Sequence, residues 1–584
     1  MDKNSSSGMA MIRRLLRLAR PFRGPFLLAA LMALVMAPLN AYLPYLTHRI
    51  VDDYIMRSDL HGLRVWSAVF IGVLVLLTVL RYAFSILTNF LGQTIIQEMR
   101  LSVFSKILSF RLSYFDRSAV GTNTTRTIND LESINVVFSE GLITIVSDIL
   151  SLLMVLVMMF YTSVKLTLIS LVTFPLLLIA SYVFKEKVKA SYQRVRNEVA
   201  QMNSFLQEHI SGMRLVQIFT AEAQTAEKFR KINREYTQAN LDGIFYYAVF
   251  FPVVEIISAA SLGFMIWWGA KGVIAEEVTV GQLVAFPMFL ARLFQPVRML
   301  ADKFNTLQMG LIAAQRVFQL LDLNESERNQ GRIASGSLRG EIEFRSVNFE
   351  YVPGVPVLQD VSFRLEPGQS LAIVGSTGSG KTSLISVLTR LYDIQSGEIL
   401  IDGRPVTEYE LGYLRSRFGL VLQDVFLFYG TIADNISLRN DAITREEIIA
   451  TCKSIGADEF LSRLPGGYDY MVAERGANLS MGQRQLISFV RALLYRPDIL
   501  ILDEATSSID TQTEQVIQNA IAKLVNGRSS IVIAHRLSTI RTSDRIMVLS
   551  GGKIEEFGTH QELMQHTGGL YYELHQTQLE TENL

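Results

Sequence analysis

The sequence has almost no cysteine, and it has no excess of either charge. Cys452 is the single cysteine in 584 residues. One thiol permits neither an internal disulfide framework nor a cysteine metal cluster. Lysine and arginine number 55, and aspartate and glutamate also number 55, so the formal net charge is zero. This balance argues against a strongly basic nucleic-acid binder, and we expect no nucleic-acid partner.

Proline and glycine are also scarce. The chain has 14 prolines and 38 glycines without a period, which excludes a fibrous protein. Hydrophobic residues make up 49% of the chain, which excludes a disordered one. The mean hydropathy of +0.27 is high for a soluble protein. The position of these apolar residues therefore decides the class of protein.

Charged residues are nearly absent from long stretches of the first half. About 20 mostly apolar residues suffice for a helix to cross a bilayer. Six such segments are predicted: 24–48, 64–88, 138–162, 164–184, 243–270 and 278–300. The alternative is a large buried helical core, but soluble core helices of this length keep a polar face. We therefore predict an all-α transmembrane domain over residues 24–323.

The distribution of lysine and arginine predicts the orientation of these spans. Positive charges concentrate before the first span, after the second and after the fourth, whereas the alternate connections are short and poor in them. Both termini and the two long connections should therefore be cytoplasmic, in a multi-pass protein of the cell membrane. Residues 1–23 are expected to form an amphipathic helix on the inner surface. Residues 97–112 and 185–229 show helical spacing of apolar residues, which predicts that membrane helices extend into the cytoplasm.

The pattern changes after Leu323. Residues 324–340 are polar and are predicted to be a linker. In residues 341–584, short β-rich apolar runs alternate with helical ones, which indicates an α/β domain with a largely parallel sheet. The predicted strands are 341–349, 370–374, 399–401, 418–421, 499–502, 530–533 and 545–549.

A phosphate-binding loop follows the predicted strand 370–374. The motif G-x-x-x-x-G-K-[ST] lies between a strand and a helix, the context that gives it meaning. Its glycines let backbone N–H groups surround phosphates, while the lysine reaches the β- and γ-phosphates and the threonine hydroxyl suits Mg²⁺. The predicted ATP contacts are Gly375, Ser376, Thr377, Gly378, Ser379, Gly380, Lys381, Thr382 and Ser383.

Two carboxylates end the apolar strand 499–502. Asp503 suits the Mg²⁺ shell, directly or through water, and Glu504 is placed to polarise the attacking water. Downstream of a phosphate-binding loop, this pair predicts a nucleoside triphosphatase.

A further motif, Leu479-Ser480-Met481-Gly482-Gln483, resembles the L-S-G-G-Q signature of ABC ATPases. The resemblance implies roles for other positions that follow in the family's order. Tyr351 would stack on adenine, Gln423 would join the Mg²⁺ and water sites, and His535 would contact the γ-phosphate. Asp510 lies in the segment that resembles the D-loop, and Glu474-Arg475-Gly476 resembles a short segment typical of exporters. Thr382, Gln423 and Asp503 are the implied Mg²⁺ residues, and Glu504, His535 and Gln423 the catalytic ones.

Six spans followed by one such ATPase domain resemble an ABC exporter half-transporter over nearly the whole chain. In that family, short coupling helices at the cytoplasmic tips press into the ATPase domains. Residues 111–116 match the first tip, and residues 211–222 are the candidate second. The family also sandwiches ATP between the phosphate-binding loop of one domain and the signature of another, so a second half-transporter is implied. Transport by alternating access would follow.

One position departs from the family pattern, and the membrane domain leaves its cargo open. Met481 stands where the signature usually has glycine, which favours a heterodimer with unequal sites over tolerated variation in a homodimer.

The expected cargo is amphipathic small molecules or lipids. A dedicated lipid or glycolipid flippase working as a homodimer is the alternative, and an ATP-gated channel is disfavoured by intact catalytic positions. Four charged residues lie in or near spans with open roles, as pairing or as function: Arg81, Asp148, Glu255 and Arg292.

Overall fold

The computed structural model describes residues 3–18, 20–503, 511–533 and 540–582, without the side chains of some helical residues such as 297–302. The chain forms two compact units. The first comprises Met1–Ser109 and Ser118–Asn324, and the second comprises Phe110–Arg117 and Glu325–Leu584. A short segment of the first half of the chain therefore belongs to the second unit.

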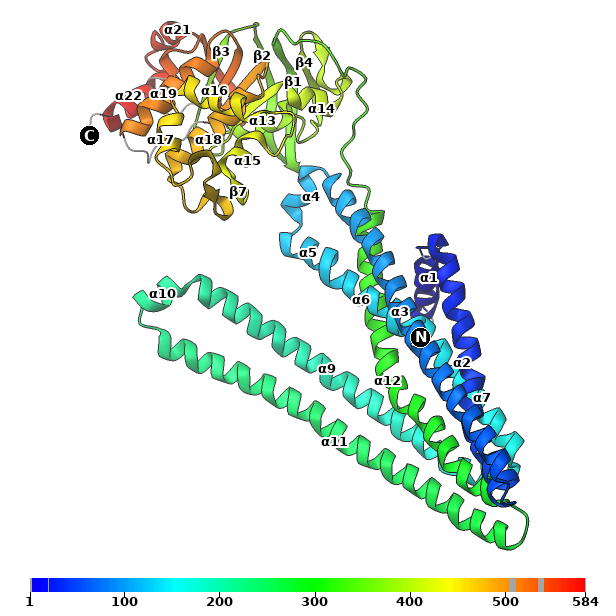
Figure 1. Cartoon of the computed structure of the whole chain (residues 1–584). Coiled ribbons are helices and arrows are strands. Elements are labelled where there is room, and N and C mark those ends of the chain that lie inside the picture. The colour runs from blue at the N-terminus through cyan, green and yellow to red at the C-terminus, as the bar shows by residue number, and fades with distance from the viewer. Residues whose placement is uncertain (1–2, 19, 504–510, 534–539, 583–584) are drawn as a thin grey trace. The chain divides into compact units, whose positions relative to one another are not determined.

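The first unit is entirely helical. A short helix near the N-terminus precedes long helices that run side by side for much of their length (Figure 1). Their bounds are α1 Lys3–Leu18, α2 Arg23–Arg49, α3 Leu60–Leu108, α5 Val120–Thr125, α6 Leu131–Val136, α7 Ile143–Thr162, α8 Val164–Leu171, α9 Phe174–Ser211, α10 Met213–Ile218, α11 Glu222–Ile274 and α12 Val280–Asp322. Short π-helical segments join α5, α6 and α7 into one run.

Among the described residues, five helical runs are long and apolar enough to cross a membrane. They are Arg20–Ile55, Leu60–Leu108, Gly121–Thr162, Val164–Ser211 and Glu222–Ile274. The sixth predicted span, 278–300, falls in α12, part of whose side chains lie outside the described set. Large apolar side chains on these helices face outward, as lipid contact requires, with Leu27 66% and Ile71 60% exposed.

Local sequence signals begin the helices at the outer turns. The Asp59 carboxylate accepts hydrogen bonds from the backbone N–H groups of His61 and Gly62 at the start of α3. Thr279 and Gln282 form a capping box at the start of α12. In both cases the side chains accept hydrogen bonds from backbone N–H groups that the first turn of a helix leaves without a partner.

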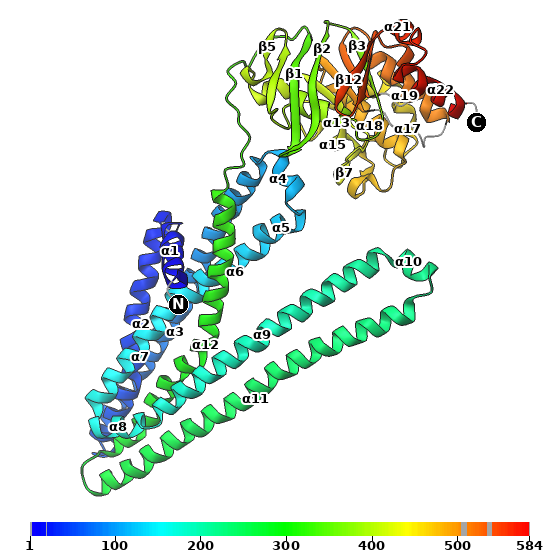
Figure 2. The same ribbon diagram turned by 180° about the vertical axis from the view of Figure 1, so that it is seen from behind.

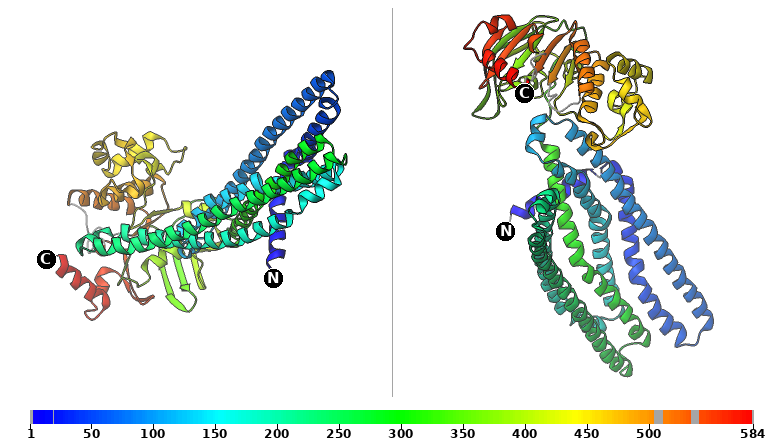
Figure 3. Two further views of the ribbon diagram at one scale, coloured as in Figure 1. Left: turned by 90° about the horizontal axis from the view of Figure 1, so that it is seen from below. Right: turned by 90° about the vertical axis from the view of Figure 1, so that its left-hand side faces the viewer.

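The two long helices α9 and α11 pack against each other and are joined at one end by the short helix α10 (Figures 2 and 3). Both are longer than a bilayer requires, at 38 and 53 residues. They therefore carry α10 beyond their apolar segments, as the sequence predicts for the second long connection.

The second unit contains a six-stranded sheet in the order β12-β11-β3-β10-β9-β6. Five of its strands are parallel, and β12 is antiparallel to β11. The bounds are β3 Ser370–Val374, β6 Phe418–Val421, β9 Ile499–Asp503, β10 Ser529–Ile533, β11 Arg545–Ser550 and β12 Lys553–Gly558. The predicted α/β fold with a largely parallel sheet is confirmed.

An antiparallel sheet in the order β2-β1-β4-β5 accompanies it. Its strands are β1 Ile342–Val352, β2 Val355–Leu365, β4 Ser396–Ile401 and β5 Arg404–Pro405. A two-stranded sheet pairs β7 Gly430–Thr431 with β8 Met471–Val472. The helices of this unit include α4 Leu112–Arg117, α13 Lys381–Leu388, α14 Leu411–Ser416, α15 Ile432–Ser437, α16 Arg445–Ile455, α17 Asp458–Ser462, α18 Met481–Leu494, α19 Thr511–Val525, α21 His560–Met564 and α22 Leu570–Glu582.

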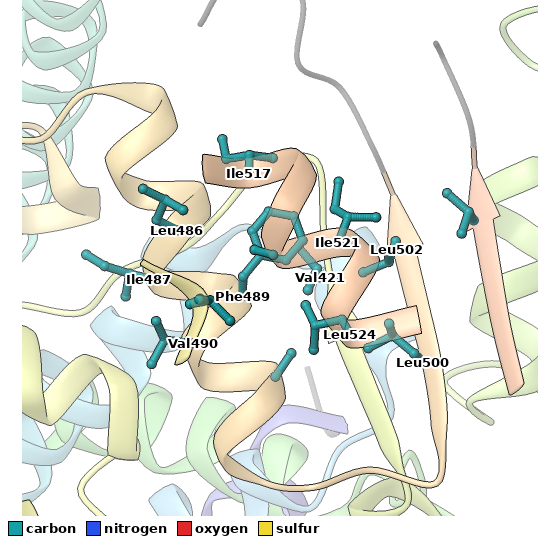
Figure 4. Close-up of a cluster of buried hydrophobic side chains, with 14 of the residues drawn as sticks. Val421, Leu486, Ile487, Phe489, Val490, Leu500, Leu502, Ile517, Ile521 and Leu524 are labelled. Atoms are coloured by element: carbon teal, nitrogen blue, oxygen red, sulfur yellow. The ribbon is translucent and has the colours of Figure 1, made fainter. Parts of the chain in front are cut away.

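One face of the parallel sheet packs on α18 and α19 (Figure 4). Leu500 and Leu502 of β9 lie against apolar side chains of both helices, and all five residues of β9 are buried. Burial of apolar surface contributes about 25 cal/mol per Å² to the stability of the fold, and this contribution holds β9 in its position. The packed core therefore also fixes the position of Asp503, the last residue of β9.

Candidate nucleotide-binding site

The carboxyl ends of the parallel strands bring the predicted site together. The phosphate-binding loop follows β3, Gln423 follows β6, and Asp503 is the last residue of β9. Because these strands are parallel, their carboxyl ends meet at one edge of the sheet, where open α/β sheets bind ligands. Glu504, Asp510 and His535 lie outside the described residues.

Three positions of the loop Gly375–Gly380, Gly375, Gly378 and Gly380, have positive φ angles that favour glycine. Gly375 has φ +153°, and a Cβ atom there would lie 2.1 Å from the carbonyl oxygen of Leu549. Gly380 has φ +105° and precedes the first turn of α13. The glycines thus allow the loop to pass close to β11 and to present backbone N–H groups at a helix N-terminus, as phosphate binding requires.

Lys381 lies under this loop. Its side chain is 9% exposed, and Nζ donates hydrogen bonds to the carbonyl oxygens of Gly375 (2.8 Å) and Ser376 (2.9 Å). Burial lowers the pKa of the Lys381 ammonium, and the negative charge of Asp503 partly offsets this effect. A phosphate would supply the negative charge that this buried ammonium lacks.

Ser379 adds a second feature that fits a phosphate. Its hydroxyl oxygen is buried and has no hydrogen-bond partner within the described residues. Gly378, by contrast, faces open space, since a Cβ atom there would meet no heavy atom within 4 Å. The loop therefore fits the phosphates of ATP, with buried donors on one side and room on the other.

Tyr351 stands near the end of β1, with 46% of its surface exposed. Its hydroxyl donates to Ser383 Oγ at 3.1 Å, which ties the ring to helix α13 directly behind the phosphate-binding loop. The ring meets Phe349 and Tyr392 edge-on, with centroids 4.7 Å and 5.0 Å away. These contacts hold the ring of Tyr351 at its edges. Part of its surface remains exposed, as stacking on the adenine base would require.

The three predicted Mg²⁺ residues differ in exposure. Asp503 is buried at 7% exposure, whereas Thr382 and Gln423 are exposed. Within the described part of the chain, no group of three His, Cys, Asp or Glu residues could hold a metal ion alone. A hydroxyl, an amide oxygen and one carboxylate suit Mg²⁺ that also binds phosphate oxygens. Mg²⁺ binding at these residues stays a prediction.

The signature residues form the N-terminus of α18. Ser480 and Gln483 build a capping box, in which Ser480 Oγ accepts from the Gln483 N–H at 3.2 Å and Gln483 Oε1 accepts from the Ser480 N–H at 2.9 Å. Leu479 is buried, and its carbonyl oxygen accepts from Arg484 at 3.0 Å. In the described structure, no hydrogen bond joins these residues to the phosphate-binding loop. Their predicted contact with a partner's nucleotide is untested.

The segment Phe110–Arg117, which contains α4, is part of the second unit and bonds to the start of its longer stretch. Phe110 makes an antiparallel bridge with Ser326, and the Arg111 N–H donates to the Glu325 carbonyl oxygen at 2.9 Å. The Arg111 guanidinium also bonds the Glu325 carboxylate at 2.6 Å. The first predicted coupling tip is therefore attached to the ATPase unit through backbone and side chain.

Sequence reasoning missed Tyr392, which connects this segment to the nucleotide site. Its hydroxyl donates a hydrogen bond to the Asp116 carboxylate, and its ring contacts Tyr351. Burial and the bond to Asp116 both raise the pKa of Tyr392, so the phenol remains a neutral donor. A cavity of about 520 Å³ beside these residues is lined by Arg111, Asp116, Tyr351 and Tyr392. No sequence spacing pairs residues this far apart.

The second predicted tip, residues 211–222, contains α10 and carries exposed apolar side chains. Met213, Leu215 and Ile218 of α10 are 41%, 62% and 64% exposed, and Phe219, directly after the helix, is 74% exposed. Large apolar residues gathered on one short helix mark an interaction surface.

A phosphate-binding loop at the edge of a parallel sheet, in one chain with long apolar helices, defines a nucleotide-binding domain fused to a membrane domain. The family described as "ABC transporter transmembrane region" matches residues 26–297, and the family described as "ABC transporter" matches residues 358–507. The chain belongs to the ABC transporters, as a half-transporter of the exporter type with both domains fused. The predicted resemblance is confirmed.

Relatives match almost end to end. An ATP-dependent lipid A-core flippase of Syntrophus aciditrophicus is 34% identical over 99% of this chain and 96% of its own. A probable multidrug resistance ABC transporter protein of Bacillus subtilis is 37% identical over 89% of this chain and 78% of its own. A bacterial Atm1-family ABC exporter, solved with ATP bound, has a TM-score of 0.79 at 28% identity, covering 95% of this chain and 98% of that one.

These findings confirm the broad function. The protein is an ATP-binding, ATP-driven translocase of the exporter type. It is a multi-pass membrane protein with its ATPase domain in the cytoplasm.

Proposed function

We propose that the protein is one half of a dimeric ABC exporter that moves or flips amphipathic small molecules or lipids by alternating access. One observation carries the proposal. Phe110–Arg117 connects the membrane helix α3 to α5, yet it belongs to the compact ATPase unit. Any movement of the ATPase domain must therefore act on both helices through this segment.

Two features support a dimer. The signature residues and the phosphate-binding loop occur once each, and the family's composite site takes one from each of two domains. The exposed apolar side chains of α10 would also be buried if they packed against the ATPase domain of a second half-transporter.

The residues at the sheet edge support turnover of ATP. Lys381 and the N–H groups of the loop would hold the phosphates, and Thr382, Gln423 and Asp503 would hold the Mg²⁺. A bound Mg²⁺ would neutralise charge that develops on the phosphates. Glu504 orients and polarises the attacking water, and His535 contacts the γ-phosphate.

The functions of two relatives favour an amphipathic cargo. One is a lipid A-core flippase and another a probable multidrug resistance transporter. Phe- and Met-rich helices also suit a cargo with an apolar part. A dedicated lipid or glycolipid flippase working as a homodimer is the second candidate.

Met481 favours a heterodimer over that alternative. It occupies the first turn of α18, with a half-buried side chain, where the family pattern has glycine. The partner's own signature would then complete the site that holds Lys381 and Glu504. This site would hydrolyse ATP, while the site that Met481 completes would be slow.

The test is ATP-dependent lipid movement in proteoliposomes made with the purified complex. A head-group-labelled phospholipid is followed by its accessibility to a membrane-impermeant quencher. We expect ATP to shift the label between leaflets, and Glu504→Gln to abolish both this shift and hydrolysis while ATP still binds. Label movement at equal rates with and without ATP would refute the proposal.

The subunit composition is tested by expressing this chain alone. A stable homodimer with full substrate-stimulated ATPase activity would exclude the obligate heterodimer. We expect instead that full activity requires a second half-transporter with an intact L-S-G-G-Q motif.

A further inference from the structure

Helix α1 is attached to the last turns of α12 through one arginine. Arg14 donates two hydrogen bonds to the Asp322 carboxylate, from Nη1 at 2.6 Å and from Nη2 at 2.5 Å. The central carbon of its guanidinium group also lies 4.1 Å from the centroid of the Phe318 ring. The hydrogen bond from Arg14 lowers the pKa of the Asp322 carboxyl, so the pair stays charged at neutral pH. A two-pronged pair over a ring fixes the direction of this contact as well as its distance.

The contact lies where the chain leaves the membrane unit. Leu15, next to Arg14, is fully buried, and α1 packs on α12. Asp322 is the last residue of α12, and the ATPase unit resumes at Glu325. Whatever holds α1 in place therefore also acts on the end of α12 and on the start of the connection to the ATPase unit.

The other face of α1 is basic. Residues 3–23 contain six cations and no aspartate or glutamate. Three arginines on this face are exposed, and within the described part of the chain none of them forms an ion pair. Together with one leucine that is 39% exposed, they form a surface that we call the basic face of α1: Arg13, Leu16, Arg17 and Arg20.

The basic face lies on the cytoplasmic side of the membrane. The first run of residues able to cross the bilayer begins at Arg20, directly after α1. Because α12 continues into the cytoplasmic ATPase domain, the bond between Arg14 and Asp322 places α1 on the same side. Anionic lipids give the inner leaflet a negative surface potential, which attracts basic segments that adjoin a membrane helix.

We propose that the basic face of α1 binds anionic head groups of the inner leaflet, and that the contact between Arg14 and Asp322 transmits this binding to the end of α12. Lipid-bound α1 holds Asp322 in place and thereby orders the last turns of α12. Without anionic lipid, α1 and the end of α12 are free to move together. The inference depends neither on the cargo nor on the subunit composition.

The lipid contact is measured by photo-cross-linking of the full transporter complex in phosphatidylcholine nanodiscs. The probes are phosphatidylglycerol and phosphatidylcholine with the same photoreactive acyl chain. We expect phosphatidylglycerol to label residues 9–23 at least about fivefold more, the factor that one arginine near an anionic surface contributes. Arg17→Gln combined with Arg20→Gln should remove most of this difference, whereas Lys453→Gln, on the exposed face of α16, should not. Equal labelling by the two lipids would overturn the proposal.

Transmission to α12 is measured by hydrogen exchange of the backbone amides of residues 315–322 in nanodiscs with and without phosphatidylglycerol. We expect phosphatidylglycerol to slow this exchange about two- to fivefold, the scale of one exposed ion pair. Arg14→Gln and Asp322→Asn should each abolish the difference while phosphatidylglycerol still labels α1. A lipid effect that persists in both variants would show that this contact does not transmit the binding.

An exchange of the two charges separates the ion pair from a merely structural role of either side chain. Arg14→Glu alone should remove the lipid effect on α12, and adding Asp322→Arg should restore it, because opposite charges then face each other again. No recovery in a double variant that still binds ATP would overturn the proposal. Neither measurement uses transport, so a lipid-dependent α12 without ATP-driven lipid movement would refute the proposed export and leave this inference standing.

Discussion

The hydrogen bond between Tyr392 and Asp116 should couple the segment Phe110–Arg117 to the nucleotide site. Tyr392→Phe removes the hydroxyl and keeps the ring, whose contacts with Tyr351 and Phe349 therefore persist. A hydrogen bond to a charged acceptor contributes about 1.5–3 kcal/mol when it is shielded from water. Because Asp116 is exposed, we expect the lower value or less, about 1 kcal/mol.

A loss of about 1 kcal/mol corresponds to a factor of about five in the equilibrium between attached and detached segment. Tyr392→Phe should therefore lower lipid movement per ATP hydrolysed by up to this factor, with little change in ATP affinity. The assay compares transport and hydrolysis in the same proteoliposomes. Tyr413→Phe is the control, because it removes a tyrosine hydroxyl whose hydrogen bond goes to the Gly336 carbonyl oxygen instead.

A double-mutant cycle decides whether the two residues act as a pair. If they do, Asp116→Asn added to Tyr392→Phe should reduce coupling little further, giving an interaction energy of about 1 kcal/mol. Strictly additive losses would show that the hydrogen bond does not carry the coupling.

Three further predictions concern the ATPase unit. Lys381→Ala should weaken ATP binding at this chain's site by about tenfold or more, measured with a fluorescent ATP analogue, while Lys453→Ala on the exposed face of α16 should not. Tyr351→Ala should raise the KM for ATP by about tenfold with a smaller fall in kcat, since base stacking contributes similarly to ground and transition states, and an unchanged KM would place the stacking elsewhere. Phe115→Ala on α4 should lower transport more than hydrolysis, and equal losses in both would argue against a coupling role.

Much of the architecture is predictable because its signals are local. The apolar spans, the strand before the phosphate-binding loop and the strand before Asp503 can each be recognised within one short contiguous stretch of sequence. Strand β2 is absent from the predicted strands, although the alternation of apolar and polar residues in Val361–Leu365 is the ordinary signal of a strand buried on one face. In the structure, β1 pairs with β2 along its length.

The contacts between distant segments could not be predicted. Asp116 and Tyr392 belong to parts of the chain with different composition, and neither has an unusual neighbour. Likewise, hydropathy identifies Arg81 and Arg292 as interruptions of apolar runs but cannot say that both face one cavity while Asp148 pairs with Lys303. Those facts depend on how α3, α7 and α12 pack.

The N-terminus of α18 shows why Met481 bears on the choice between homodimer and heterodimer. Within the described residues, the N–H of Gln483 is satisfied by Ser480 Oγ and that of Arg484 by the Ser480 carbonyl oxygen, so the N–H groups of Met481 and Gly482 are the donors left for a phosphate. Met481, one of these two donor residues, carries a side chain where the family pattern has glycine. If this N-terminus faces the partner's nucleotide, as we propose, the side chain leaves the donor in place but would add bulk beside the phosphate, which would slow closure of the site rather than abolish binding. A composite site of this kind would suit the holding of ATP rather than its turnover.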